Sequence, residues 1–324
     1  MAPIDRRLRV FAWMVRRQGS IAGKTEAEVI ALQARHMPDN AVTNFIFGKV
    51  APGIEASNRT IPGPGGDIPV RVYRGPDPVG RAGPGGTGSS GTRPLILYFH
   101  GGGFVLGELR MGDWLCSQVA RNVGAVVVSV DYRLAPRHRF PVAVDDCYAA
   151  VLWAAENAGS LGAGGPLGIM GESAGGNLSA VVSLLARDGG GPAISHQVLI
   201  YPATDMTSVP PATATTPFLT ASEMHAYREH YLADADPSDP RLSPMLAKDH
   251  AKLPPALIQV GEHDPLRDSG VRYAATLRAA GVPVRLTEYV GMPHGFLNFP
   301  GLCRWAPQAL AEICAEQKAA LVRS

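Results

Sequence analysis

A short stretch after an apolar run carries the residue best suited to act as a nucleophile. The letters GESAG at 171–175 spell G-x-S-x-G, directly after LGIM at 167–170 and before a helix-like stretch at 176–187. A strand before this pattern and a helix after it form the context in which the central serine is presented on a tight turn. Such a turn tolerates only small neighbours, which favours Ser173 as a nucleophile. The pattern alone also fits a strand-to-helix turn that is merely rich in small residues.

A second stretch predicts a site for a negatively charged oxygen. The letters HGGG at 100–103 follow the apolar run LILYF. Acyl transfer passes through a tetrahedral oxyanion that preorganised backbone N–H groups stabilise, and glycines let the backbone approach it closely. In this arrangement the N–H of Ala174 is the partner donor. A phosphate-binding loop is the rival interpretation, but the Lys-Ser/Thr of a P-loop is missing. We expect His100 to brace the loop rather than to act as a base.

Two further loops supply an acid and a base. A serine hydroxyl becomes a good nucleophile when an imidazole takes its proton, and a carboxylate holds that imidazole in the required tautomer. GEHDPLRD follows the apolar run ALIQV, and GMPHGF follows VRLTEYV. Asp264 is the preferred acid, with Glu262 and Asp268 as alternatives. His294 is the preferred base, because His263 adjoins the acid and the remaining histidines fall in the expected cap or in helices.

The elements that must position these residues are short strands separated by helix-length segments. The continuous apolar runs lie at 95–99, 125–130, 167–170, 198–201, 256–260 and 284–290. Strands covered by helices on both faces have such continuous apolar runs, so the sequence predicts a mostly parallel, doubly wound α/β sheet. The alternating stretch at 68–73 predicts a half-exposed strand. The nucleophile, the acid and the base then all follow the carboxyl ends of strands.

Two segments outside this alternation predict a helical cap. We expect residues 1–50 and 205–245 to form it, and residues 51–204 and 246–324 to form the catalytic domain, because ligands bind beyond the carboxyl ends of such sheets. Near the N-terminus, Thr25 and Glu28 have the spacing of a capping box. An earlier helix is expected to bury Leu8, Phe11, Ala12 and Val15. A membrane-surface or substrate-entry helix is the alternative. The Gly/Pro-rich stretch at 75–94 predicts a loop without a function of its own.

Composition excludes several classes of protein. A hydrophobic content of 46% and a charged content of 18% are those of an ordinary core-forming chain. The formal charge of +2, without a long Lys/Arg run, argues against nucleic acid as a partner. The apolar stretch at 10–15 is too short to insert stably in a membrane. The four cysteines lack CxxC spacing, which predicts no metal site and no disulfide framework; the cytoplasm is the expected location.

Several motifs together resemble the hormone-sensitive-lipase family of α/β hydrolases, the bacterial family IV esterases. Besides HGGG and GESAGG, these are DYRLAP at 131–136 with the following FP and DD, then DPLRD at 264–268 and HGF at 294–296. The resemblance runs from about residue 95 to residue 296 and implies the α/β-hydrolase fold. It departs from the family at two positions: Glu172 stands where Asp is usual, and Arg137 where Glu is usual.

This resemblance implies a full set of site residues. Ser173, Asp264 and His294 would be the catalytic triad, which stands in the family's chain order of serine, acid and histidine. Gly102 and Gly103 would be oxyanion donors together with Ala174, and Gly101 is a further candidate.

The expected activity is hydrolysis of short- to medium-chain acyl esters through an acyl-serine intermediate, with a small-molecule ester as substrate and without a cofactor. A ligand-binding receptor that kept the fold without turnover is the alternative from another class, and the presence of His294 argues against it. Amide or lactone hydrolysis would use the same triad. The sequence leaves open whether the chain forms a homodimer.

Overall fold

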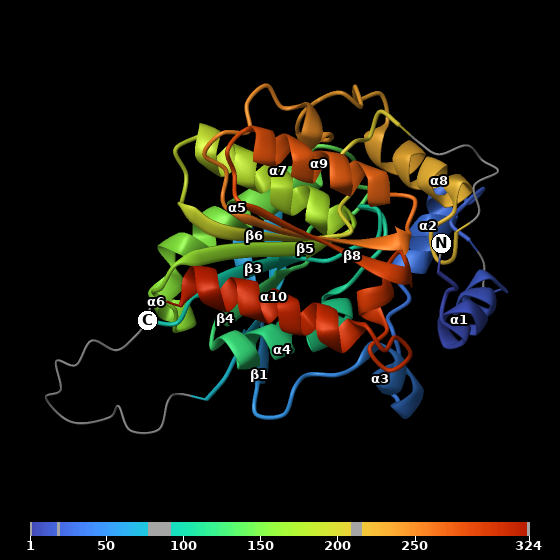
Figure 1. The fold of residues 1–324 in the computed structure, drawn as a ribbon, viewed down its shortest axis with the longest axis horizontal. Coiled ribbons are helices and arrows are strands. Elements are labelled where there is room, and N and C mark those ends of the chain that lie inside the picture. The colour runs from blue at the N-terminus through green and yellow to red at the C-terminus, as the bar shows by residue number, and fades with distance from the viewer. Residues whose placement is uncertain (1, 18–19, 77–91, 209–215, 323–324) are drawn as a thin grey trace, which may run out of the picture.

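The computed structural model describes residues 2–17, 20–76, 92–208 and 216–322, and one eight-stranded sheet runs through it (Figure 1). Its strand order is β1-β2-β4-β3-β5-β6-β7-β8. The strands are β1 (Glu55–Gly63), β2 (Gly66–Arg74), β3 (Leu95–Phe99), β4 (Val126–Val130), β5 (Leu167–Glu172), β6 (Ile194–Ile200), β7 (Ala256–His263) and β8 (Val284–Pro293). From β4 to β8 all neighbours pair in parallel. The predicted mostly parallel α/β-hydrolase sheet is confirmed.

Every apolar run of the sequence lies in one of these strands or at its end, but the edge strand β1 was missed. Its sequence EASNRTIPG buries Ile61 alone, so it has no periodic apolar pattern to detect. It is held instead by an antiparallel ladder to β2 that pairs Ile61 with Ile68. Pro62 is tolerated there because an edge strand has one side without ladder hydrogen bonds.

Helices cover both faces of the sheet (Figure 1). They are α1 (Arg6–Arg17), α2 (Glu26–Gln33), α3 (Ala41–Phe47), α4 (Asp113–Val123), α5 (Val142–Glu156), α6 (Ala158–Leu161), α7 (Ala174–Asp188), α8 (Ala221–Leu232), α9 (Arg267–Ala279) and α10 (Ala306–Leu321). Helices α5, α7 and α9 lie on one face, whereas α4 and α10 lie on the other.

Alternate residues of the central strands supply these two cores. In β3, Leu97 and Phe99 pack toward α5 and α7, and Ile96 and Tyr98 pack toward α4. All five β3 residues are buried, which explains the continuous apolar run. Because β5, β7 and β8 are parallel, the loops that follow them meet at one edge of the sheet, and the residues with chemistry in the sequence lie on these loops.

Helix α1 differs in part from its expected burial. Leu8, Phe11 and Ala12 are buried as predicted, and Phe11 packs against the rings of Phe47 and Phe299. The prediction for Val15 was wrong, because this side chain is 38% exposed. Val15 lies near the end of α1, beyond the part of the helix that packs on the core, and it lines a cavity instead.

Capping boxes begin three helices that lie outside the sheet layers, α2, α3 and α8. Thr25 and Glu28 form the predicted box at the start of α2. Thr220 and Glu223 form another at the start of α8. The Ser20 hydroxyl donates to the Glu223 carboxylate at 3.0 Å, so the N-terminal segment is tied to α8. In the expected loop at 75–94, residues 77–91 lie outside the described part of the chain.

The four cysteines are free and buried. Among the helices of the described segments, none has the length and apolar character needed to cross a membrane.

Candidate active site

Ser173 lies on a tight turn between β5 and α7. Its φ of 54° and ψ of −116° are strained values for a residue with a side chain. Neighbouring backbone leaves no room for larger residues: a Cβ on Gly171 would lie 2.1 Å from the Gly175 carbonyl oxygen, and one on Gly175 would lie 1.9 Å from the Phe99 carbonyl oxygen. These contacts explain the glycines of the GxSxG pattern and hold the serine at the end of the strand.

A continuous hydrogen-bonded line joins the serine to a buried carboxylate. Ser173 Oγ lies 2.9 Å from His294 Nε2, and His294 Nδ1 lies 2.8 Å from Asp264 Oδ2. The second carboxylate oxygen accepts the backbone N–H of Leu266. Since an ionised carboxylate only accepts, His294 donates through Nδ1, and Nε2 is left to accept the serine proton. All three predicted residues are therefore brought together.

The alternative acids face other partners. Glu262 accepts the backbone N–H groups of Ala2 and Gly291. Asp268 is an exposed partner of the Arg267 guanidinium, with its side chain 83% accessible. Asp264, by contrast, has a fully buried side chain beside the imidazole. Its geometry is that of the residue which orients the base.

The loop after β3 lies against this serine. Gly101, Gly102, Gly103 and Ala174 line the same cavity as Ser173. Gly102 has a φ of +117°, and a Cβ there would lie 2.0 Å from the Leu106 carbonyl oxygen. Only glycine fits such a position without a shift of the backbone. The loop thus needs its glycines for the conformation that places its backbone beside Ser173.

His100 is a buried support of this loop. Its ring stacks on Tyr132 with the ring centres 4.3 Å apart, and Nδ1 lies 2.8 Å from the Gly101 carbonyl oxygen. The Tyr132 hydroxyl donates to the carbonyl oxygen of His100. Burial lowers the pKa of His100 to about 4, which keeps the ring neutral at physiological pH. These contacts agree with the bracing role expected from the sequence.

The serine opens into a cavity of about 260 Å³. Tyr201 and Phe299 line it, together with Val15 from α1 and with Met224, Tyr227 and Arg228 from α8. In Figure 1, α1, α2 and α8 gather beyond the same end of the sheet. The cavity is therefore lined both by residues at the carboxyl edge of the sheet and by residues of the two segments expected to form the cap, 1–50 and 205–245.

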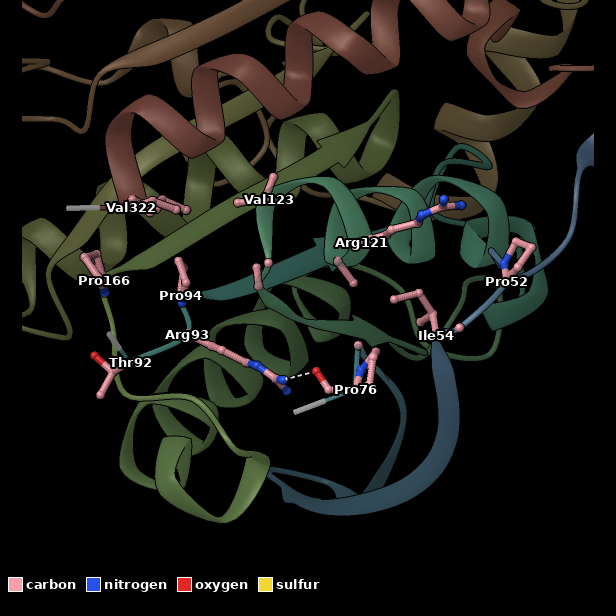
Figure 2. A pocket seen from close by; sticks show the side chains of 16 residues that line it. Pro52, Ile54, Pro76, Thr92, Arg93, Pro94, Arg121, Val123, Pro166 and Val322 are labelled. Atoms are coloured by element: carbon pink, nitrogen blue, oxygen red, sulfur yellow. Dashed lines mark hydrogen bonds between the residues drawn. The ribbon is translucent and has the colours of Figure 1, made fainter. Parts of the chain in front are cut away.

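A second hollow lies at the opposite end of the sheet, where β3 and β5 begin. It measures about 670 Å³, and Figure 2 shows Arg93 and Arg121 among the side chains that line it. Arg93 donates to the carbonyl oxygen of Pro76. None of the described residues around this hollow is a serine, cysteine, histidine or carboxylate. Of these two hollows, only the smaller one around Ser173 combines a serine and a histidine in its lining.

Glu172, which precedes Ser173 and departs from the family pattern, is held in a buried hydrogen-bond network. Its carboxylate accepts the hydroxyl protons of Tyr98 at 2.5 Å and Tyr201 at 2.6 Å. The Tyr201 ring in turn packs edge-on against His294, with the ring centres 4.9 Å apart. Burial raises the pKa of the Glu172 carboxyl above its ordinary value of 4.5, although the phenol hydroxyls oppose this rise. Through Tyr201, Glu172 thereby connects the end of β5 to the ring that packs against His294.

Sequence reasoning missed Tyr201 and Tyr227 as parts of this site. Tyr201 directly follows β6, so its place after a strand next to the nucleophile strand was an available signal. Tyr227 packs on Gly103, where an added Cβ would lie 2.4 Å from its ring. No local pattern predicts that contact, because α8 and the glycine loop are far apart in the chain. The other departure from the family, Arg137, is exposed and has no contact that explains it.

We predict that Glu172→Gln destabilises the protein by about 2 kcal/mol, because an amide NH₂ cannot accept and one buried phenol loses its partner. The folded-state pKa of Glu172 is raised, so its carboxyl favours folding most below pH 4.5, and this contribution falls as the pH rises through the folded value. The loss in the variant should therefore be largest in acid and should shrink as the pH rises.

Urea unfolding at pH 5 and pH 8 measures both effects. Glu55→Gln, at an exposed edge-strand carboxylate, is the matched control and should change stability by less than about 0.5 kcal/mol. A loss that grows with pH would contradict the network as described.

Comparisons with known proteins agree with this geometry. A family model described as the alpha/beta hydrolase fold matches residues 96–298. The chain is 45% identical over 256 residues to the carboxylic ester hydrolase LipN of Mycobacterium tuberculosis; that match covers 76% of this chain but only 65% of LipN, just under two thirds. It is 40% identical to esterase LipI of the same organism, over 80% of each protein.

Solved structures are similar over nearly the whole length. A hyperthermophilic esterase from the archaeon Pyrobaculum calidifontis superposes with a TM-score of 0.86 at 36% identity, covering 98% of this chain and 99% of that one. The motifs lie within the residues that the family model matches, as do the parallel strands from β4 to β8. The chain belongs to the α/β-hydrolase fold family, in the branch of esterases that resemble hormone-sensitive lipase.

Proposed function

We propose that this protein hydrolyses short- to medium-chain carboxylic esters, with Ser173 as nucleophile, His294 as base and Asp264 as the acid that orients it. The observation that carries the proposal is the unbroken line of hydrogen bonds from Ser173 through His294 to Asp264. Ester hydrolysis is the activity named for the related LipN and LipI. A small-molecule ester is accordingly the proposed substrate.

The chemistry proceeds in two halves. His294 Nε2 takes the Ser173 proton as Oγ attacks the ester carbonyl carbon, and the carbonyl oxygen becomes an oxyanion. The backbone N–H groups of Gly102, Gly103 and Ala174 would stabilise this charge. His294 then returns the proton to the leaving alcohol, which leaves an acyl-Ser173 ester. Water, activated by the same imidazole, releases the acid and restores the serine.

A receptor that binds esters without turnover is the competing function. Such a protein needs the cavity but not the serine–histidine contact at 2.9 Å. Here the strained backbone of Ser173 and the buried Asp264 support a nucleophile and its base, so catalysis is the function we prefer. The free, buried state of the four cysteines fits a reducing compartment such as the cytoplasm.

The proposal includes a cap that limits substrate size. Residues 1–50 and 205–245 would form it, and their described members Val15, Phe218 and Met224 line the cavity opposite the catalytic serine. A space of about 260 Å³ accommodates a short acyl or alcohol group beside the polar residues. Longer chains would have to displace these side chains or stay in water.

We predict that Asp264→Asn lowers kcat by up to about 10⁴-fold, because an amide no longer holds the imidazole in the productive tautomer. Asp268→Asn is the matched control on the same loop. Its side chain is exposed and pairs with Arg267, so its kcat should stay within about twofold. Steady-state kinetics on p-nitrophenyl butyrate measures both variants. The reverse ranking would assign the role of the acid to Asp268.

We predict that kcat/KM rises by about fourfold for each added methylene, from about 0.8 kcal/mol of burial, until the cavity is full and then falls. Phe218→Ala should move this optimum to longer chains, because its ring lines the cavity. Phe47→Ala is the control: Phe47 belongs to the same aromatic cluster through Phe299 but does not line the cavity. A graded series of p-nitrophenyl esters gives the profile. A steady rise to the longest chains in the wild-type protein would rule out a closed pocket.

A further inference from the structure

Exposed apolar side chains gather on two N-terminal helices. Of the large hydrophobic residues that are exposed in the described chain, most lie on α1 or α3: Val10, Trp13, Met14, Val15, Val42 and Phe45. Phe45 is 62% exposed and Trp13 is 54% exposed. Single exposed apolar residues are ordinary, but a gathered set indicates a surface that contacts something other than water.

Helix α1 is apolar on two opposite sides. Its inner stripe of Leu8, Phe11 and Ala12 packs on the protein. Its outer stripe of Val10, Trp13 and Met14 has the same i, i+3, i+4 spacing but faces outward. A helix on the surface of a water-soluble domain normally carries polar residues there. The inner stripe packs on the protein, whereas Val10 and Met14 of the outer stripe are exposed to solvent.

The outer stripe forms a groove with α3. Val10 and Met14 face Val42 and Phe45 across a hollow of about 810 Å³. We call this set of residues, with Trp13, the N-terminal apolar patch. Because the patch spans two helices, it can contact an extended surface rather than a single side chain.

Positive charge borders the patch. Arg6, Arg7 and Arg9 are all exposed on α1, and neither α1 nor α3 contains an acidic residue. Two carboxylates lie close by: Asp5 lines the same hollow and offsets one of these positive charges, whereas Asp39 is paired with Arg110. The surface next to the apolar side chains therefore presents a net positive charge.

We propose that the N-terminal apolar patch docks the protein reversibly on an anionic lipid surface. Trp and Phe side chains enter the boundary between headgroups and acyl chains, while arginines bind anionic headgroups. A second copy of the chain is the less favourable occupant, because a twofold contact would place the same arginines against one another. An anionic lipid surface would bury the apolar side chains and bind the arginines.

Docking would bring the catalytic cavity to the lipid. Val15 directly follows Met14 in α1 and lines the cavity that contains Ser173. In that respect the inference builds on the proposed ester hydrolysis, since esters dissolved in lipid would be delivered at the cavity rim. Vesicle binding itself is independent of turnover, so the two proposals can fail separately.

Co-sedimentation with vesicles tests the docking. The full chain should bind vesicles of equal parts phosphatidylglycerol and phosphatidylcholine, release them as salt is added, and bind pure phosphatidylcholine much more weakly. The combined variant Arg6→Gln, Arg7→Gln and Arg9→Gln should lose about a hundredfold in affinity, at roughly fivefold for each arginine. Phe45→Glu should abolish binding while p-nitrophenyl butyrate turnover in solution stays unchanged.

Val290→Glu is the matched control, because Val290 is 58% exposed on β8 and lies outside the patch. It should bind the anionic vesicles as the wild type does. Failure of the wild type to bind them, or an equal loss in Val290→Glu, would overturn the proposal. So would a dimer in size-exclusion chromatography that only Phe45→Glu dissociates, since a second copy would then occupy the patch. Vesicle binding by a protein without esterase activity would sustain the docking and reject the proposed function.

Discussion

The close approach of two strand ends is the constraint on which the site depends. The turn after β5 touches the end of β3 so tightly that a Cβ on Gly175 would lie 1.9 Å from the Phe99 carbonyl oxygen. This contact places the serine of one turn beside the glycine loop of the other. Because β3 and β5 are adjacent parallel strands, both turns emerge at the same edge of the sheet. The juxtaposition of Ser173 and the glycine loop, the proposed nucleophile and oxyanion donors, is thus a consequence of the sheet register.

Buried polar groups stabilise this edge from below. Glu172 is fully buried and accepts hydrogen bonds from the hydroxyls of Tyr98 and Tyr201. The Tyr201 ring in turn packs against the imidazole of His294. Asp264 is buried at the other side of His294. Each of these groups is costly to bury without partners, and each has them. The hydrogen-bonded line from Ser173 through His294 to Asp264 is therefore held by an arrangement that loses hydrogen bonds if any member moves.

How much of this could be predicted from the sequence depends on the range of the interactions. The parallel strands and the loops that carry Ser173, Asp264 and His294 were predictable, because apolar runs and strand-end loops are local patterns. The sequence preferred Asp264 as the acid but left Glu262 and Asp268 as alternatives, because all three lie within one loop and only the fold determines which of them faces the imidazole. The edge strand β1 was missed because pairing, not burial, holds it. Val15 was misassigned because helical spacing cannot show where the core beneath a helix ends.

Chemical identification of the acyl-enzyme tests the central claim most directly. A rapid acid quench of the protein during turnover of p-nitrophenyl butyrate, followed by proteolysis and mass spectrometry, locates the covalent intermediate. Our account predicts a butyryl group on the Ser173 hydroxyl of the wild-type protein, and neither this adduct nor rapid turnover in Ser173→Ala. A butyryl group on another residue, or wild-type turnover by Ser173→Ala, would contradict it.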